Sequence, residues 1–178
     1  GRTAEAETLF LRSIRQLGYR GSIVHYVGMS HYFRLAPVDD AYLVGGAGDP
    51  LCAPARAWHL AFLQECRRTG FSPILSRSYE VLAQHCPEGW KQRDWNGNPS
   101  LTGWDPPSSL LSPANTAAMA WLQLVAAEFV LLMQVAEVGI RFQVGEPWWW
   151  IFADGRICIY DDAAKAAFGG NPVEISNL

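Results

Sequence analysis

Hydrophobic positions recur at helical spacing in three parts of this chain, and each part is followed by a short apolar run. The first helix is predicted for Thr3–Leu17, where Leu9, Phe10 and Ile14 contribute to one apolar face and Gly18 ends the helix. The next run, Ser22–Val27, is rich in β-branched and aromatic residues and is predicted to be a strand.

The same succession occurs twice more. It predicts a helix at Pro54–Arg68 before a strand at Phe71–Ser78, and a helix at Pro113–Val138 before a strand at Ile140–Val144. The links from helix to strand are short and those from strand to helix are long. This alternation predicts parallel strands joined by helical crossovers, with the long loops at the face that carries function in β/α barrels.

The chain changes character after Trp150. Asp154-Gly155 predicts a turn between residues 150–153 and 156–160, and Asp161–Phe168 a final short helix. A complete eightfold barrel needs about 250 residues, with about 200 as the lower bound. The fold class expected for these 178 residues is therefore α/β: one partial or reduced TIM-barrel-like domain over residues 1–178, plus a C-terminal β-hairpin.

Composition narrows the classes of partner. Hydrophobic residues make up 49% of the chain and charged residues 17%, with a formal net charge of −3. Because no basic stripe is present, nucleic acid is not expected to bind. The apolar segment 117–138 is interrupted by Gln123, Glu128, Gln134 and Glu137, which predicts a buried or amphipathic helix and no insertion into a membrane.

The sequence gives no sign of a metal or a cofactor. Cys52, Cys66, Cys86 and Cys158 lack the spacing of a zinc site and are expected to be free thiols. The glycines of 45–48 lack the strand and helix that a phosphate-binding loop requires.

Glu146 is the strongest candidate for chemistry. It follows the predicted strand Ile140–Val144 and precedes Pro147, which ends the hydrogen-bonding ladder. A carboxyl group among indoles has a raised pKa and can protonate a departing glycosidic oxygen. The alternative is a carboxylate that caps a turn or pairs with Arg141 or Arg156. Both interpretations stay open.

Six tryptophans fall in two loops that follow predicted strands. They are Trp90, Trp95, Trp104, Trp148, Trp149 and Trp150. Successive side chains of an extended segment point to opposite sides, so the last three cannot all enter one core. Indoles stack on sugar rings, and polar neighbours such as Arg93 and Asp94 bind hydroxyls. This concentration predicts a sugar-binding cleft, although any single tryptophan can instead serve packing.

Glu80 takes the corresponding place after the second strand, beside Tyr79. It can act as the second carboxylate, orient Glu146, bind a hydroxyl, or make a structural hydrogen bond. Tyr79 is expected to contact substrate, as is His25 near the end of the first strand, where a plain hydrogen-bonding role is the alternative.

Gly145-Glu146-Pro147 resembles the Asn-Glu-Pro motif that ends the fourth strand of retaining β/α-barrel glycoside hydrolases. The resemblance implies that Glu146 is the acid/base of a retaining hydrolase. Gly145 stands where that clan has an Asn that binds the sugar 2-hydroxyl. The nucleophile of the clan follows a seventh strand that is not visible here.

A wider pattern is similar to barrel-type domains in tail proteins of prophages and gene transfer agents, over residues 20–165. It comprises Ser76–Glu80, Trp90–Asp94, Thr102–Pro107 and Gln143–Trp150. The resemblance implies a piece of a larger non-contractile-tail or baseplate protein, made in the bacterial cytoplasm and located in the virion tail. It implies two partners: envelope polysaccharide or peptidoglycan, and other tail proteins. The alternative is a non-catalytic structural or assembly module, whose indoles form a subunit interface.

Overall fold

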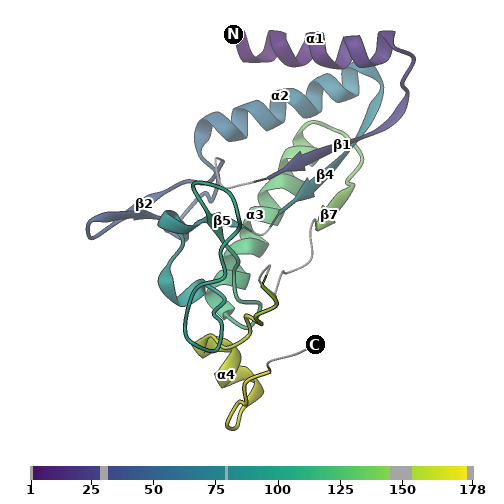
Figure 1. Cartoon of the computed structure of the whole chain (residues 1–178). Helices are drawn as coiled ribbons and strands as arrows, with labels where there is room; N and C mark the ends of the chain where they lie inside the picture. Colours follow the sequence, from purple (N-terminus) through teal and green to yellow (C-terminus); the bar gives the residue numbers. More distant parts are fainter. Residues whose placement is uncertain (1, 29–31, 79, 145–153, 176–178) are drawn as a thin grey trace.

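A computed structural model describes residues 2–28, 32–78, 80–144 and 154–175, without the side chains of residues 2–7 (Figure 1). The three predicted pairs of helix and strand are present. They are α1 (Arg2–Gln16) with β1 (Gly21–Val27), α2 (Ala53–Thr69) with β4 (Phe71–Arg77), and α3 (Thr116–Val135) with β7 (Phe142–Val144).

The three strands form one parallel sheet in the order β1-β4-β7. Val24 pairs with Ile74 across β1 and β4, and Leu75 pairs with Phe142 across β4 and β7. Parallel neighbours need long connections, and α2 and α3 supply these crossovers. The predicted α/β fold with a parallel sheet is confirmed.

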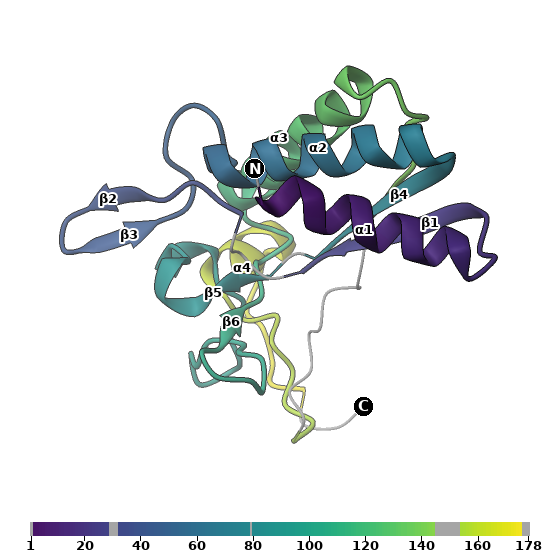
Figure 2. The same cartoon turned by 90° about the horizontal axis from the view of Figure 1, so that it is seen from above.

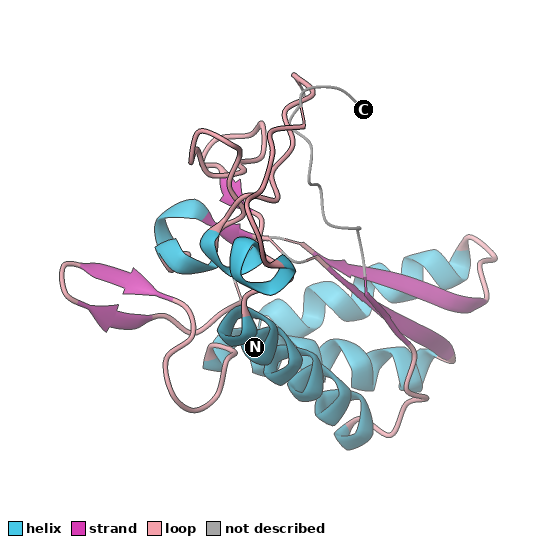
Figure 3. Cartoon of the chain, turned by 90° about the horizontal axis from the view of Figure 1, so that it is seen from below, coloured by secondary structure: helices cyan, strands magenta, loops and turns pink. Residues whose placement is uncertain are grey.

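The helices lie on one side of the sheet (Figure 3). Because side chains alternate along a strand, Leu75 and Val27 point toward the helices and are buried. They join a core made with α2 and α3 that includes Phe62, Leu63, Val125, Phe129 and Met133. Val24 and Tyr26 point the other way and keep 58% and 47% of their surface exposed. The sheet is thus covered on one face.

The ends of α2 follow the prediction, whereas the end of α3 does not. Gly70 closes α2 in the left-handed conformation, with φ of 76°. Helix α3 begins after Asn115, whose side chain accepts a hydrogen bond from the backbone NH of Ala118 at 2.9 Å. It ends at Val135 with Ala136 as its C-cap, and Glu137, with φ of 53°, takes the left-handed position expected of Gly139.

Helix α3 is the helix of the described residues that is long and apolar enough to cross a membrane. One side of it is nevertheless part of the core, where Trp121, Val125, Phe129 and Met133 are buried. A buried role was one of the two expected for this segment.

The loops predicted after the first two strands carry structure of their own. After β1, β2 (Ala36–Val38) and β3 (Ala41–Leu43) form an antiparallel hairpin that projects from the body (Figure 2). After β4 come β5 (Val81–Leu82), the 3₁₀ turns η1 (Ala83–His85) and η2 (Glu88–Trp90), and β6 (Ser108–Ser109). Strands of two or three residues are too short for hydrophobic periodicity to reveal them.

The predicted C-terminal hairpin is not seen. Its first half, residues 150–153, lies outside the described residues, and residues 156–160 form no strand within the part described. Tyr160 instead donates its backbone NH to the carbonyl of Arg93, so this segment lies along the loop after β4. The short final helix is confirmed as α4 (Asp162–Phe168), capped by Asp161, whose side chain accepts from the NH of Ala164.

Replacement of Gly45 by alanine is expected to destabilise the fold at the base of the hairpin. Gly45 has φ of 88°, and a Cβ there would lie 2.6 Å from Cη2 of Trp90. Overpacking adds about 1–3 kcal/mol to the cost of the left-handed backbone. Gly97→Ala is the matched control, because Gly97 has φ of 83° with open space around it. Equal losses of unfolding free energy in urea titrations would contradict this reading.

Candidate functional site

The C-terminal ends of β1 and β4 point toward one region, made of residues 80–112 and 154–175 (Figure 1). In β/α barrels this end of the strands carries the functional loops. The region is therefore the candidate site.

Glu80 lies at this end in a buried polar cluster with Arg77 and Tyr32. Their exposed fractions are 4%, 3% and 5% respectively. Arg77 donates Nη1 to the carbonyl of Leu122 at 3.2 Å. Burial raises the pKa of the Tyr32 hydroxyl, with the charge of Arg77 opposing that shift and the charge of Glu80 adding to it. The burial of Glu80 favours a positioning or hydrogen-bonding role among the alternatives for this residue.

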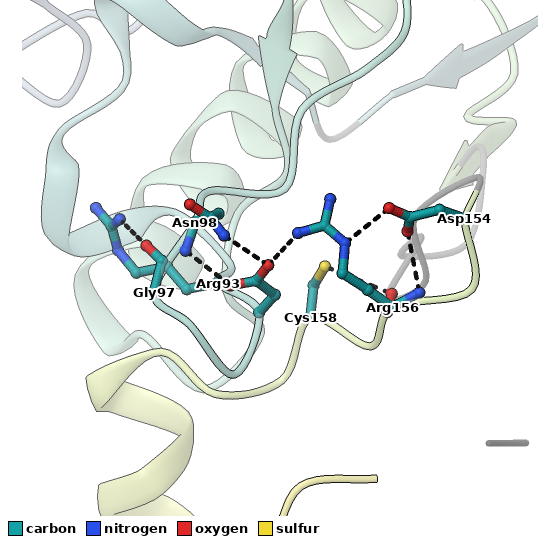
Figure 4. A network of polar contacts seen from close by, with 7 residues as sticks. Arg93, Gly97, Asn98, Asp154, Arg156 and Cys158 are labelled. Atoms are coloured by element: carbon teal, nitrogen blue, oxygen red, sulfur yellow. Dashed lines mark hydrogen bonds and ion pairs between the residues drawn. The ribbon is translucent and has the colours of Figure 1, made fainter. Parts of the chain in front are cut away.

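Asp94 is the centre of a polar network that fixes the loop after β4 (Figure 4). Its carboxylate accepts from the backbone NH and Nδ2 of Asn98 at 2.8 and 2.9 Å, and pairs with Arg156. Burial opposes the charge of Asp94, but the Asn98 hydrogen bonds and Arg156 outweigh it and hold the pKa below its usual value. Asp94 thus ties residues 94–98 to the segment that begins at Asp154.

Arg93 borders a small charged pocket beside this network. Its guanidinium donates to the carbonyl of Gly97 and to Oε2 of Glu88, both at 2.7 Å. The charged pocket has a volume of about 210 Å³ and is lined by Glu88, Gly89, Lys91, Arg93, Asp161 and Asp162. Oδ2 of Asp161 is buried and has no hydrogen-bond partner in the part of the chain that is described. The pocket offers both cationic donors and a carboxylate acceptor to a polar ligand.

The tryptophans of the loop after β4 divide between surface and interior. Trp95 is 40% exposed and packs edge to face against Tyr160, with 5.1 Å between ring centroids. Trp104 is 46% exposed. Trp90 packs against the core, 5.7 Å from Trp121 between centroids. The exposed positions of Trp95 and Trp104 are compatible with a binding surface, whereas the position of Trp90 favours a packing role.

His25 lies on the helix side of β1 and not among the strand-end loops. Its ring packs against those of Trp58, His59 and Phe62 on α2, with centroids 4.7 to 5.4 Å apart. Burial, with a smaller contribution from His59, lowers the pKa of His25 to about 4. This placement favours packing over contact with a ligand.

Several candidates lie outside the described residues. They are Tyr79, Glu146, Trp148, Trp149 and Trp150. Their proposed roles rest on the sequence alone.

Within the described ranges no group of His, Cys, Asp and Glu is arranged to hold a metal ion. The four cysteines are free thiols, and burial raises the pKa of Cys66 and Cys86 to about 12.

Sequence reasoning missed two contributors to the site. Asp161 is expected at a helix start, and nothing in the neighbouring sequence indicates that it lines a pocket together with Lys91, 70 residues earlier in the chain. Tyr160 was assigned to a strand because it ends an apolar run. The alternation of tryptophans with polar residues in 90–95 is the sequence pattern that correctly indicated this region as part of the site.

The fold is that of a β/α barrel-type domain with its candidate site at the carboxyl ends of the strands. Residues 3–178 match the family model of the non-contractile tail sheath protein TIM barrel. The chain therefore belongs to this family, and it is a component of a phage tail that associates with other tail proteins. A comparison with curated proteins finds none that matches.

Lowering the pH is expected to destabilise the fold through His25. The folded chain keeps this ring neutral down to about pH 4, whereas the unfolded chain takes up a proton below about 6.5. Stability therefore falls from pH 6.5 to pH 4, by on the order of 3 kcal/mol for this residue. His25→Phe should flatten the dependence in urea titrations. The control Val125→Ala, a fully buried residue of α3, should lower stability similarly at each pH, and an unchanged slope in His25→Phe would refute the assignment.

Proposed function

We propose that this tail sheath domain binds glycans of the bacterial envelope at the carboxyl ends of its strands. The observation that carries the proposal is the position of Trp95. Its half-exposed indole packs against Tyr160, and it comes two residues after Arg93, which lines the charged pocket. An aromatic face beside clustered polar groups is what a sugar ring with its hydroxyls requires.

The rigidity of this surface supports binding. The hydroxyl of Tyr160 donates to the carbonyl of Val173 at 3.0 Å and accepts from the NH of Ile175 at 2.8 Å. Its backbone NH donates to the carbonyl of Arg93. Asp94 in turn fixes the loop by accepting a hydrogen bond from the backbone NH of Asn98. A side chain that is fixed before binding loses little conformational entropy when the ligand arrives.

The charged pocket supplies hydrogen-bonding groups of both kinds. Lys91 and Arg93 share Glu88, which leaves their remaining NH groups as donors. Glu88, whose side chain is 72% exposed, contributes carboxylate acceptors, and Asp161 and Asp162 complete the lining. The volume of about 210 Å³ suits one sugar unit or a small polar substituent of one. A ligand with alternating donors and acceptors, such as an amino sugar, meets these requirements.

The proposal extends to hydrolysis of the bound glycan. In that reaction Glu146 protonates the departing glycosidic oxygen, and Glu80 orients Glu146 or acts as the second carboxylate. Tyr79 and Trp148–Trp150 contact the sugar. The role of Glu146 derives from the resemblance to retaining glycoside hydrolases, and the other roles derive from the positions of these residues after predicted strands. Gly145 in place of the clan's Asn removes one contact to the substrate.

A second candidate function is a purely structural one in tail assembly. Leu124, Leu131 and Val135 form an apolar stripe on the outer side of α3, with 56%, 45% and 55% of their surface exposed. A neighbouring tail protein can bury this stripe without any ligand at the strand ends.

Titration calorimetry with soluble peptidoglycan fragments separates these functions. Trp95→Ala should weaken binding about tenfold, since aromatic contacts of this kind are worth on the order of 1 kcal/mol or more. Tyr42→Ala is the matched control, because Tyr42 is an exposed aromatic residue on the β2–β3 hairpin. Equal affinity in wild type and Trp95→Ala, or no binding to fragments or to envelope polysaccharide, would favour the assembly function.

Sugar release in the same samples tests hydrolysis separately. Glu146→Gln should abolish release while binding persists. Binding without release from the wild-type chain would restrict the function to recognition.

A further inference from the structure

We propose that copies of this chain associate head to tail, with the tip of the β2–β3 hairpin of one copy seated in a groove at the basic end of the next. The hairpin and the basic end lie at opposite ends of the molecule (Figures 1 and 2). This contact uses a different surface from the strand-end loops and does not require glycan binding.

The basic end is the part of the molecule where helices α1 and α2 finish and strands β1 and β7 begin. A hydrogen bond from Arg141 to Oγ of Ser22 at 2.6 Å, and one from Arg15 to the carbonyl of Thr69, hold these segments together. Two carboxylates of the described residues lie here, Glu65 and Glu137, against five arginines: Arg15, Arg20, Arg67, Arg68 and Arg141. This end is therefore positive, although the whole chain has a formal net charge of −3.

The positive charge of the basic end is available to a partner. Arg67 and Arg68 pair with Glu137 and Glu65, yet their side chains keep 57% and 52% of their surface exposed. Exposed ion pairs contribute little to stability, so incoming carboxylates can compete for these guanidinium groups. The described acceptors of the other three arginines are carbonyl and hydroxyl oxygens, which leave their charge without compensation within the described ranges.

A groove between the ends of α2 and α3 opens on the basic end. It has a volume of about 320 Å³ and is lined by Gln64, Arg67, Arg68, Val135 and Ala136. Val135 is 55% exposed, so the groove combines an uncovered apolar side chain with two guanidinium groups. A partner that complements it presents carboxylates next to small apolar side chains.

The tip of the β2–β3 hairpin has this composition. Val38 pairs with Ala41, so Asp39 and Asp40 form the two-residue turn between the strands. All four residues are exposed. Because residues opposite each other in an antiparallel pair share one face, Val38 and Ala41 lie side by side next to the two carboxylates. The tip thus matches the groove in both charge and apolar surface.

The base of the hairpin is held by the body, whereas its tip projects from it (Figure 2). At the base, the backbone NH of Val44 donates to the carbonyl of His85 at 3.0 Å, and the ring of His85 donates to the carbonyl of Tyr42 at 2.7 Å. A two-stranded hairpin by itself is marginally stable in water. The tip therefore gains stability when a partner buries it.

A second copy of this chain satisfies both surfaces at once. Each pair formed in this way still has one unoccupied hairpin and one unoccupied groove. The contact is heterologous, and it repeats from copy to copy into a ring or a filament. A different acidic protein in the groove would leave the hairpin of this chain without a partner.

Sedimentation velocity over a range of protein concentrations tests this association. The unsubstituted chain should form species larger than a dimer, and rising salt should weaken them because the attraction is between exposed charges. Asp40→Arg should weaken association at least about tenfold, since like charges then meet in the groove. Glu174→Arg is the matched control: it makes the same change of charge at an exposed residue outside both surfaces, and it should associate like the unsubstituted chain.

A charge exchange separates the contact from any folding defect. Arg67→Asp should weaken association as Asp40→Arg does, whereas an equimolar mixture of the two variants should associate again, because each tip then meets a groove of opposite charge. An unsubstituted chain that stays monomeric at every concentration would overturn the proposal. Association that is unchanged in Asp40→Arg, a mixture that does not recover, or recovery of a closed dimer alone would also overturn it.

Discussion

Strand β4 is the element on which the rest of the fold depends, because it is hydrogen-bonded to a parallel strand on each side. Each parallel pairing forces a long crossover, and the crossover helices must then bury their apolar sides against the sheet. This single constraint places α2 and α3 on one face and brings all three strand ends to the same edge. The described loop after β4, which carries Glu80 and residues 90–104, begins at this edge.

Polar contacts join the separate segments of the loop region. The carboxylate of Asp94 binds Asn98 and Arg156, and the backbone carbonyl of Arg93 accepts a hydrogen bond from the NH of Tyr160. These contacts join segments about sixty residues apart in sequence. They leave Trp95 fixed yet half exposed, which distinguishes it from Trp90 in the core. A fixed aromatic surface beside a charged pocket supports the proposed recognition of glycans.

Much of the fold could be predicted because its signals are local. Glycines after helices and apolar runs between them located all three strands of the sheet, and Asp161 indicated α4. The hairpin β2–β3 escaped because strands of three residues carry no measurable period. The predicted hairpin near Gly155 is not shown, because half of it lies outside the described residues. In the described half, the backbone NH of Tyr160 bonds to the carbonyl of Arg93, a contact that no local pattern encodes.

The candidate site was only partly predictable for the same reason. Interleaved tryptophans and charges marked residues 90–95, but the sequence could not distinguish Trp90, which packs against the core, from the exposed Trp95. His25 was expected among the loops, yet the alternation of β1 turns it toward Trp58 and Phe62. The pocket around Asp161 depends on a tertiary contact and leaves no mark in the neighbouring residues.

The most direct measurement is hydrogen–deuterium exchange of the unsubstituted protein with and without soluble peptidoglycan fragments or envelope polysaccharide. Glycan recognition at the strand ends predicts slower exchange in residues 92–104, with residues 36–43 of the β2–β3 hairpin unchanged. Unchanged exchange throughout, or protection confined to the hairpin, would contradict the account.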